Sequence, residues 1–338
     1  MEKDKPAKSL RKILIVKIGA IGDVVMASTV IEAAREGNPN VELSWLCGRG
    51  VEKLVRSFSG ISEVIAIDEN NLISGFIWQR LMELIKIWRA VFFKKYDLVV
   101  TGHTDWRYLL LSFPVLAKER RSFRGRGLVR GRWHASEYAR LIHNQDGPFA
   151  QSPVMAPFKK ESEEIRINIP NDCQSILFFP GGAKNMLRDD AIRRWPIEYY
   201  RELAEKFIKR NFSIILSGGY NDYWVRESFI GLKYIDMIGK VDLPQIIELC
   251  QKCTLVITHD SGPMHLAYAS GVKTLALFGP TNPYEKVPNC HNVKVVWGGA
   301  NLPCRPCYDG RGYSICSSNN CLKNLSVELV YEEALKML

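Results

Sequence analysis

The sequence has no apolar run that approaches the roughly 20 residues needed to span a bilayer. Its opening residues, Met1-Glu2-Lys3-Asp4-Lys5-Pro6, are polar, so we expect no secretory signal and a cytoplasmic protein. In such a chain the nine cysteines favour reduced thiols or a metal site over a disulfide framework. Of its 338 residues, 46% are hydrophobic and 24% charged, which is typical of a soluble globular protein large enough for two domains.

Acidic residues are almost missing from one stretch of a chain whose net charge is +10. Between Lys118 and His134 only Glu119 is acidic, and interleaved glycines predict a loop there. The basic residues are Lys118, Arg120, Arg121, Arg124, Arg126, Arg130 and Arg132. Such a segment suits a phosphate-rich partner, which could be nucleic acid, anionic lipid head groups or a phosphorylated saccharide. A solvated charged surface is the alternative interpretation.

Short apolar runs alternate with amphipathic stretches along the chain. In the first half we expect strands at residues 13–18, 41–46, 64–67 and 98–101, and helices at 24–35, 51–58 and 76–93. Beyond Asn144, four prolines and an acidic cluster at 161–164 indicate a connection between domains.

A second alternating series follows that connection. Strands are expected at 175–179, 213–217, 255–258, 274–278 and 293–296, and helices at 197–210, 223–231, 244–252, 262–270 and 326–338. Two such series imply two doubly wound parallel sheets, each with helices on both faces and ligands outside the carboxyl ends of its strands. We therefore predict an N-terminal domain over 1–160, a C-terminal domain over 161–325 and a terminal helix over 326–338.

The first expected strand ends in a glycine turn that carries an acid. Gly19 and Gly22 lie three residues apart, but the third glycine of the dinucleotide fingerprint is missing, and so is the Gly-Lys-Ser/Thr of a P-loop. Asp23 could be a first-turn acid that complements the helix dipole. Alternatively it is a carboxylate placed to take a proton from a hydroxyl nucleophile.

Three strand ends in the second half have features of an anion site. The run His259-Asp260-Ser261-Gly262-Pro263-Met264-His265 predicts a strand that turns into a helix capped by Asp260 or Ser261. Backbone N–H groups at such a turn attract anions, and His265 can add a donor. The glycine turn at Phe179-Pro180-Gly181-Gly182-Ala183-Lys184 precedes Arg188, Arg193 and Arg194, which suit a diphosphate. Asp222, after the glycines at 218 and 219, could accept from a ribose hydroxyl or only cap a helix.

These motifs, in this order, resemble glycosyltransferase family 9, the ADP-heptose:lipopolysaccharide heptosyltransferases. The resemblance runs from Lys12 to Leu338 and rests on Gly19–Asp23, the PGG…RRWP segment, the SGG…D segment and the HDSGPMHLA…FGPTNP segment. It implies the GT-B fold, in which two Rossmann-like domains face a central cleft. The acceptor then binds the N-terminal domain, and the nucleotide sugar binds the C-terminal domain.

The resemblance also implies a set of site residues and an inverting transfer. Asp23 becomes the catalytic base. The donor ADP-heptose is expected to contact Gly181, Gly182, Lys184, Arg193, Asp222, Asp260, Ser261, Gly262 and His265. The acceptor, a phosphorylated lipid A inner-core saccharide at the cytoplasmic face of the inner membrane, is expected to contact Gly22, Arg120, Arg121, Arg124, Arg126 and His134. No cofactor is expected for catalysis, because helix dipoles and arginines replace a divalent metal.

This chain departs from the family pattern in the second domain, where Gly181-Gly182-Ala183 replaces hydroxyl residues and residues 184–192 form a longer loop. Those departures leave the donor sugar open. The spacing of Cys304, Cys307, Cys316 and Cys321 in the loop 303–321 suits a structural zinc or iron site, with reduced thiols or an oxidised pair as alternatives.

Other functions remain as alternatives. A related transferase could use another sugar donor or a protein acceptor. A nicotinamide-dependent oxidoreductase is disfavoured by the missing third glycine and by the absence of an acid after Leu46-Cys47-Gly48. An RNA-binding protein is disfavoured because the basic segment lacks the interleaved aromatics that stack on bases, so we expect no nucleic-acid partner.

Overall fold

The computed structural model describes residues 10–124, 127–144, 154–159, 167, 174–184, 188–310 and 312–338. The chain divides into two compact units, Met1–Lys160 and Glu161–Leu338. No helix in the described ranges is long and apolar enough to cross a membrane.

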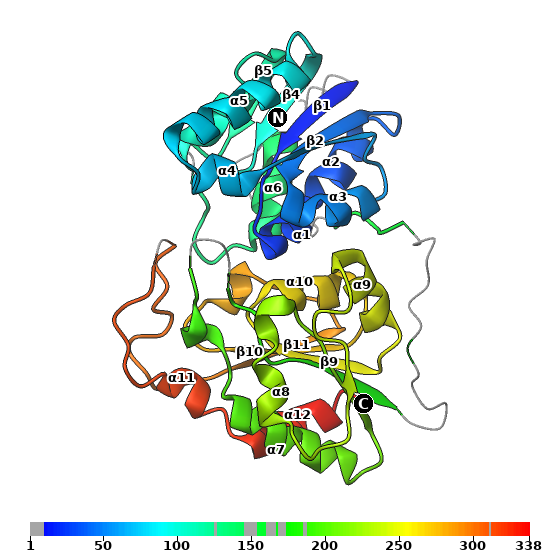
Figure 1. Ribbon diagram of the computed structural model, residues 1–338, viewed down its shortest axis with the longest axis vertical. Coiled ribbons are helices and arrows are strands. Elements are labelled where there is room, and N and C mark those ends of the chain that lie inside the picture. Colours follow the sequence, from blue (N-terminus) through cyan, green and yellow to red (C-terminus); the bar gives the residue numbers. More distant parts are fainter. Residues whose placement is uncertain are drawn as a thin grey trace, which may run out of the picture. The chain divides into compact units, whose positions relative to one another are not determined.

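Unit 1 is built on a parallel sheet of five strands in the order β3-β2-β1-β4-β5. The strands are β1 (Lys12–Val16), β2 (Glu42–Gly48), β3 (Glu63–Ile67), β4 (Lys95–Thr101) and β5 (Leu116–Ser122). The helical elements are α1 (Ile21–Ala27), α2 (Thr29–Gly37), η1 (Arg49–Val51), α3 (Glu52–Ser57), α4 (Glu69–Ile73), α5 (Ile77–Val91), η2 (Trp106–Ser112) and α6 (His134–His143). Helices α1, α2 and α6 pack together, whereas α4, α5 and η2 form a separate group (Figure 1).

Two expectations for unit 1 are corrected by the structure. The single helix expected at 24–35 is split into α1 and α2 at Ser28, whose hydroxyl donates to the Val25 carbonyl at 2.7 Å. Such back-bonding to the preceding turn bends helices. The basic segment expected to be a loop begins as strand β5 at the sheet edge. Charged side chains commonly protect edge strands from pairing with other chains. This strand therefore lacks the apolar alternation by which a strand is recognised in a sequence.

Unit 2 contains a parallel sheet of six strands in the order β11-β10-β9-β6-β7-β8. The strands are β6 (Ser175–Phe179), β7 (Ser213–Leu216), β8 (Ile235–Asp236), β9 (Leu255–His259), β10 (Thr274–Phe278) and β11 (Val293–Trp297). The helical elements are η3 (Ala191–Arg193), α7 (Ile197–Ile208), η4 (Tyr220–Asp222), α8 (Val225–Ser228), α9 (Leu243–Gln251), α10 (Gly262–Ala269), η5 (Pro283–Glu285), α11 (Asn320–Lys323) and α12 (Val327–Leu335). Helix α7 contacts α8 and α12, and α9 contacts α10 (Figure 1).

The core of unit 2 explains why the short apolar runs were readable as strands. Ile176, Leu216 and Ile257 are fully buried and belong to one cluster with Phe207 of α7 and Val330 of α12. Strands covered on both faces by helices read as continuous apolar runs, so the five expected strands agree closely with β6, β7, β9, β10 and β11. The short β8 and α11 were not expected, and the helix expected at 223–231 is reduced to α8.

Both sheets reverse their strand order beside their first strand. In unit 1 the reversal lies between β1 and β4, and in unit 2 it lies between β6 and β9. Ligands of doubly wound sheets bind outside the carboxyl ends of the strands at such a switch point. The residues that follow these four strands are therefore the ones whose chemistry matters.

Candidate active site

The switch point of unit 1 holds an ion pair between the end of β1 and the start of α1. The Lys17 side chain is only 5% exposed, and its Nζ donates to Oδ2 of Asp23 at 3.0 Å. Asp23 lies in the first turn of α1 and its side chain is 41% exposed. A buried lysine thus orients a carboxylate that solvent, and a substrate hydroxyl, can reach. The sequence motif pointed to Asp23 but not to the role of Lys17.

The end of β4 adds a neutral histidine to this site. His103 Nε2 accepts from the Ile18 backbone N–H at 3.1 Å, and its ring stacks on Tyr108 with centroids 3.7 Å apart. Burial and the charge of Lys17 lower the pKa of His103 well below its ordinary value. With Nε2 accepting, the neutral ring carries its proton on Nδ1.

Gly102 is needed next to this histidine because space is short. A Cβ atom there would lie 2.8 Å from Tyr138 and 3.4 Å from the Lys17 side chain. The Lys17 ammonium also lies over the Tyr138 ring, 5.7 Å from its centroid. Strands β1 and β4 and helices α1 and α6 therefore jointly fix the position of Lys17.

Two arginines predicted to bind the acceptor are used inside unit 1. Arg120 donates to the carbonyls of Ser112 and Val115 at 3.1 and 2.6 Å. Arg121 donates to the Leu141 carbonyl at 2.9 Å and forms an ion pair with Glu119. These contacts join β5 to its neighbouring segments, so the structure gives both arginines a structural role that charge counting alone could not reveal.

The remaining acceptor candidates are placed as follows. Gly22 is buried in α1 next to Asp23, Arg124 is exposed after β5, and His134 is the first residue of α6. Arg126 lies outside the described residues. Gly22 adjoins Asp23 in the chain, and the acceptor roles of Arg124 and His134 stay predictions.

Sequence reasoning also missed a buried acid behind the basic segment. Glu137 of α6 is fully buried and accepts from Arg132 at 3.2 Å and from Arg140 at 2.7 Å. It also accepts from the Val129 backbone N–H at 3.3 Å. Arg132 is thereby partly neutralised, and the local positive charge is smaller than the sequence indicated.

In unit 2 the turn between β9 and α10 has the expected form. Ser261 is the N-cap residue in extended conformation and Pro263 is in the first turn. The Ser261 side chain makes no capping bond, and its buried Oγ has no hydrogen-bond partner within the described structure. A buried hydroxyl of this kind is costly unless a ligand or water satisfies it.

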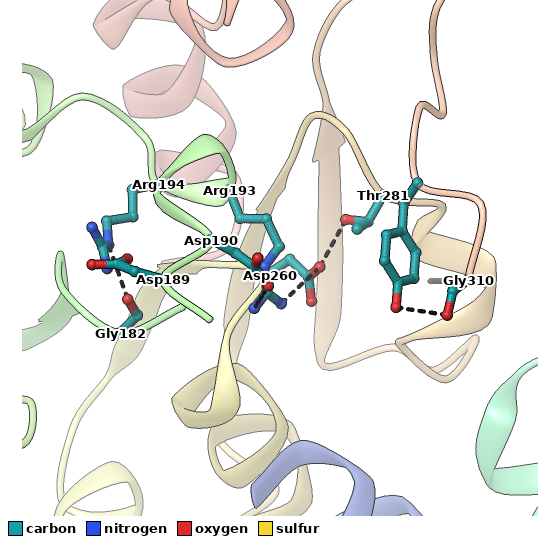
Figure 2. A network of polar contacts seen from close by, with 9 residues as sticks. Gly182, Asp189, Asp190, Arg193, Arg194, Asp260, Thr281 and Gly310 are labelled. Carbon is teal, nitrogen blue, oxygen red and sulfur yellow. Dashed lines mark hydrogen bonds and ion pairs between the residues drawn. The ribbon is translucent and has the colours of Figure 1, made fainter. Parts of the chain in front are cut away.

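Asp260 is not placed to face a phosphate. It is buried, and its Oδ2 accepts from Thr281 Oγ1 at 2.7 Å and from Arg193 at 3.5 Å (Figure 2). Burial alone would raise the pKa of Asp260, but the charges of Arg193 and Lys286 and the Thr281 hydrogen bond lower it below its ordinary value. Asp260 is therefore an ionised anchor for Arg193, a role that the sequence did not indicate.

Arg193 lies between two acids. Its second contact is an ion pair with Asp190 at 3.1 Å, and its buried Nε has no hydrogen-bond partner within the described residues (Figure 2). The two carboxylates balance the guanidinium charge, and the Nε–H group is left as an unused donor in the described structure. The neighbouring Arg194 donates to the Gly182 carbonyl at 2.9 Å and pairs with Asp189, so it closes the loop.

Asp222 ties two glycine turns together. Its Oδ1 accepts from the Gly182 N–H and its Oδ2 from the Gly219 N–H, both at 2.8 Å. A Cβ at Gly181 would lie 2.4 Å from Asp222, which explains why a glycine is needed there. The Gly182 amide is thus already used, and the ribose contact of Asp222 stays a prediction.

The last two donor candidates differ in burial. His265 is buried, with its Nδ1 2.8 Å from the Tyr268 hydroxyl, which itself donates to the Lys286 carbonyl at 3.3 Å. Nδ1 is consequently the donor in that pair. Lys184 is exposed and forms an isolated antiparallel bridge with Asp189 at the neck of the loop.

Two further polar residues at these strand ends were not expected. Ser217, which follows β7, has a buried Oγ without a hydrogen-bond partner in the described residues. His259 at the end of β9 lies 3.2 Å from the Tyr200 hydroxyl through Nδ1. Burial and the charges of Arg193 and Arg194 lower the pKa of His259 to about 3, so it is neutral.

The four C-terminal cysteines do not form a metal site in this structure. No group of three or more histidine, cysteine, aspartate or glutamate side chains in the described residues is arranged to hold an ion. The pKa of the Cys307 thiol is raised by burial and by Cys304 and Cys316. Burial, and then the other three thiols, raise that of Cys321. The expected metal site stays a prediction.

Comparison with known proteins was informative over most of the chain. Residues 149–311 match the profile of glycosyltransferase family 9 (heptosyltransferase). The lipopolysaccharide core heptosyltransferase OpsX of Haemophilus influenzae is 26% identical over 305 residues, which cover 85% of each chain. Lipopolysaccharide heptosyltransferase 1 of Pseudomonas aeruginosa is 26% identical over 319 residues, which cover 88% of this chain and 86% of that protein.

A solved structure supports the same fold. The ADP-heptose lipopolysaccharide heptosyltransferase II of E. coli aligns with a TM-score of 0.73 and 20% identity, covering 96% of this chain and 98% of that one. Two parallel-sheet units of this kind agree with the expected fold class.

Proposed function

We propose that this chain is a member of glycosyltransferase family 9 and that it transfers a heptose from ADP-heptose to a hydroxyl of the lipopolysaccharide inner core. The two relatives named above act in lipopolysaccharide synthesis and align with more than four fifths of this chain. The observation that carries the donor side is the pair of unused buried donors, Ser261 Oγ and Arg193 Nε, near the N-terminus of α10. They fit a diphosphate.

We infer that the two units divide the substrates between them. Residues 161–325 bind the donor, whose diphosphate lies at the β6–β9 switch point. Ser261, the Gly262 amide and Arg193 donate to its oxygens, and His265 contacts it from the first turn of α10. Asp260 and Asp190 hold Arg193 in place rather than touching the phosphates.

Residues 1–160 bind the acceptor and supply the base. Asp23 takes the proton of the acceptor hydroxyl while that oxygen attacks the anomeric carbon from the face opposite the nucleotide. The bond from the anomeric carbon to the phosphate oxygen breaks, and its electron pair leaves with ADP. Negative charge grows on the leaving diphosphate, so Arg193 and the α10 dipole stabilise the transition state more than the ground state. These groups take the part that a divalent ion has in other transferases.

The acceptor would be a phosphorylated, lipid-anchored saccharide. Arg124 and His134 remain candidates for its phosphates, since Arg120 and Arg121 are engaged within the unit. The enzyme would then work at the cytoplasmic face of the inner membrane. For the cysteine loop, we propose a structural zinc or iron that draws the four thiols together, and metal analysis of protein purified without chelator tests this.

A binding and transfer experiment tests the function. ADP should raise the melting temperature of the protein more than UDP or GDP does, since a ligand that binds only the folded state stabilises it. Transfer is then assayed with ADP-heptose and a heptose-free inner-core acceptor. A larger stabilisation by UDP or GDP would contradict the proposed donor. Transfer to a protein but not to the saccharide would contradict the proposed acceptor.

A matched pair of variants sharpens the donor assignment. Ser261→Ala should weaken ADP binding by about tenfold without lowering the melting temperature of the ligand-free protein, because the removed hydroxyl has no partner in the described structure. Thr281→Val is the control, because its hydroxyl is bonded to Asp260 and its loss should lower that melting temperature. Unchanged ADP affinity in Ser261→Ala would remove Ser261 from the donor site.

A further inference from the structure

Unit 1 exposes large apolar side chains in one stretch of the sequence. Twelve of the 21 exposed large apolar side chains in the described residues lie between Phe76 and Leu116. Ile77 is 85% exposed, Phe76 76% and Phe113 69%. Exposed apolar groups scattered singly are ordinary on soluble proteins, but a concentration of them marks an interaction surface.

Helix α5 carries two apolar faces. Its inner face, with Ile87 and Val91, packs on the core that includes Leu14 of β1. A second stripe with the spacing i, i+3, i+7 is formed by Trp78, Leu81 and Ile85, which are all exposed. The core of unit 1 accounts for the first face, and the second is left uncovered by the described residues.

The segment η2 continues this stripe. The Trp88 indole N–H donates to the Leu110 carbonyl at 2.7 Å, and its ring lies 6.1 Å from that of Phe113. Trp106 and Leu110 of η2 are exposed beside it. We call the exposed apolar residues of α5 and η2, with the two phenylalanines that follow α5, the α5–η2 surface; Figure 1 shows α5 as a long cyan helix of unit 1.

The charge on this surface has one sign. From Phe76 to Lys95 there are five basic residues and a single acid, Glu83. Glu83 is buried and accepts from Lys86 at 3.2 Å, so it contributes no exposed negative charge. Arg80, Lys86 and Arg89 stand among the exposed tryptophan and aliphatic side chains.

We propose that the α5–η2 surface docks on an anionic lipid bilayer, with α5 lying in the interface. Aromatic and aliphatic side chains on one face of a helix, flanked by lysine and arginine, are the composition of interfacial helices. Protein–protein interfaces, by contrast, are depleted of lysine at their centre. Helix α5 has 15 residues, so at about 1.5 Å per residue it is too short to span the bilayer and lies along it.

This inference rests on the proposed function, because a lipid-anchored acceptor requires an enzyme that reaches the membrane surface. It also places the membrane contact on α5 and η2 instead of on the basic segment. The basic segment that begins at Lys118 was expected to face the lipid, but Arg120 and Arg121 donate to backbone carbonyls. Arg80, Lys86 and Arg89 of α5 are exposed beside apolar side chains that can enter the head-group region, although Arg80 also donates to the Gly75 carbonyl and Lys86 to Glu83.

Vesicle sedimentation with the full chain tests the proposal. Wild-type protein should bind vesicles of phosphatidylcholine and phosphatidylglycerol, and bind phosphatidylcholine alone more weakly. The variant Trp78→Ser/Leu81→Ser/Ile85→Ser should lose binding by more than about tenfold, since three exposed apolar groups no longer enter the bilayer. Arg80→Gln/Lys86→Gln/Arg89→Gln should lose about fivefold per cation on the anionic vesicles only.

The matched control is Ile230→Ser/Ile315→Ser/Leu329→Ser, which removes three exposed apolar groups from unit 2 and should bind vesicles like the wild type. Melting temperature and ADP binding should be unchanged in all three variants. Transfer to a deacylated, water-soluble acceptor should also be unchanged, which separates membrane docking from the proposed function. Failure of the wild type to bind anionic vesicles would overturn the proposal. So would a wild-type dimer that the first triple variant converts to monomers without any change in vesicle binding.

Discussion

The switch points of the two sheets have the same topology and opposite chemistry. In unit 1 a half-exposed carboxylate, Asp23, is oriented by a buried lysine. In unit 2 the carboxylate Asp260 is buried and holds an arginine, while N–H and O–H donors remain unused. In a doubly wound sheet the switch point sets where a ligand binds. The residues that follow each strand decide whether that site accepts a proton or binds an anion.

The largest effect should come from removing the proton acceptor. Asp23→Asn should lower the transfer rate by about a thousandfold, the range of general-base catalysis, while ADP binding in unit 2 is unchanged. Transfer kinetics and ADP-induced shifts of melting temperature measure the two parts. Glu42→Gln, an exposed acid of the same unit, is the control and should be near wild type. Near-normal transfer by Asp23→Asn would contradict this assignment, because unit 1 would then not supply the base.

The second effect concerns the residue that orients Asp23. Lys17→Met keeps a side chain of similar length but removes the hydrogen bond to Asp23, so kcat should fall by about ten- to a hundredfold. KM for the donor and the melting temperature should both stay constant, because a partly unfolded preparation would also show a lower apparent kcat but would melt at a lower temperature. An equal change in kcat and donor KM would argue that Lys17 is only a structural residue.

Acid should weaken both units through their neutral histidines. The pKa of His259 is about 3 when folded and 6.5 by its ordinary value, so the unfolded chain binds the extra proton between these values. Its contribution to the free energy of unfolding is complete above pH 6.5 and falls by about 1.4 kcal/mol per pH unit below it. His103 acts in the same direction in unit 1.

Denaturant unfolding at pH 7 and pH 5 measures this dependence. His259→Gln should be less stable than wild type at pH 7 but should lose less stability on acidification. If wild type and His259→Gln lose the same free energy of unfolding between pH 7 and pH 5, His259 is protonated at pH 5 in the folded protein.

A smaller effect should follow from separating the glycine turns of unit 2. Asp222→Asn leaves one amide without an acceptor, which should lower the free energy of unfolding by about 1–3 kcal/mol. ADP affinity should fall with it, since the Gly182 turn is part of the donor site. Asp242→Asn, at the N-cap of α9 in the same unit, controls for loss of a carboxylate. Weaker ADP binding with unchanged stability would favour direct contact between Asp222 and the ribose.

The smallest effect should separate two kinds of arginine in unit 1. Arg124→Gln should raise KM for the acceptor by less than about tenfold and leave stability unchanged, because the side chain is exposed. Arg120→Gln should instead lower stability, since several acceptors within the fold lose their donor. The reverse pattern would restore Arg120 to the acceptor site.

Sequence patterns predicted most of the fold and part of the site. Buried strands such as β6 and β10 were readable because helices cover both faces and the apolar runs are continuous. Strand β5 was not, because an edge strand rich in charge has no apolar pattern. The glycine turns pointed to the strand ends that carry Asp23 and Ser261, since backbone geometry at a turn restricts the local sequence.

By itself the sequence determined the family resemblance, the two parallel sheets and the order of the motifs, because these depend on local patterns of apolar residues and glycines. Only the tertiary structure decided which charges are used up within the fold and which face a ligand. Lys17 donates to Asp23, Asp222 accepts from the amides of two glycine turns, and Arg120 donates to backbone carbonyls. These contacts form because separate strands, helices and loops pack side by side. The apolar pattern over 76–93 predicted a helix, but packing alone determined that one apolar face of it was left exposed.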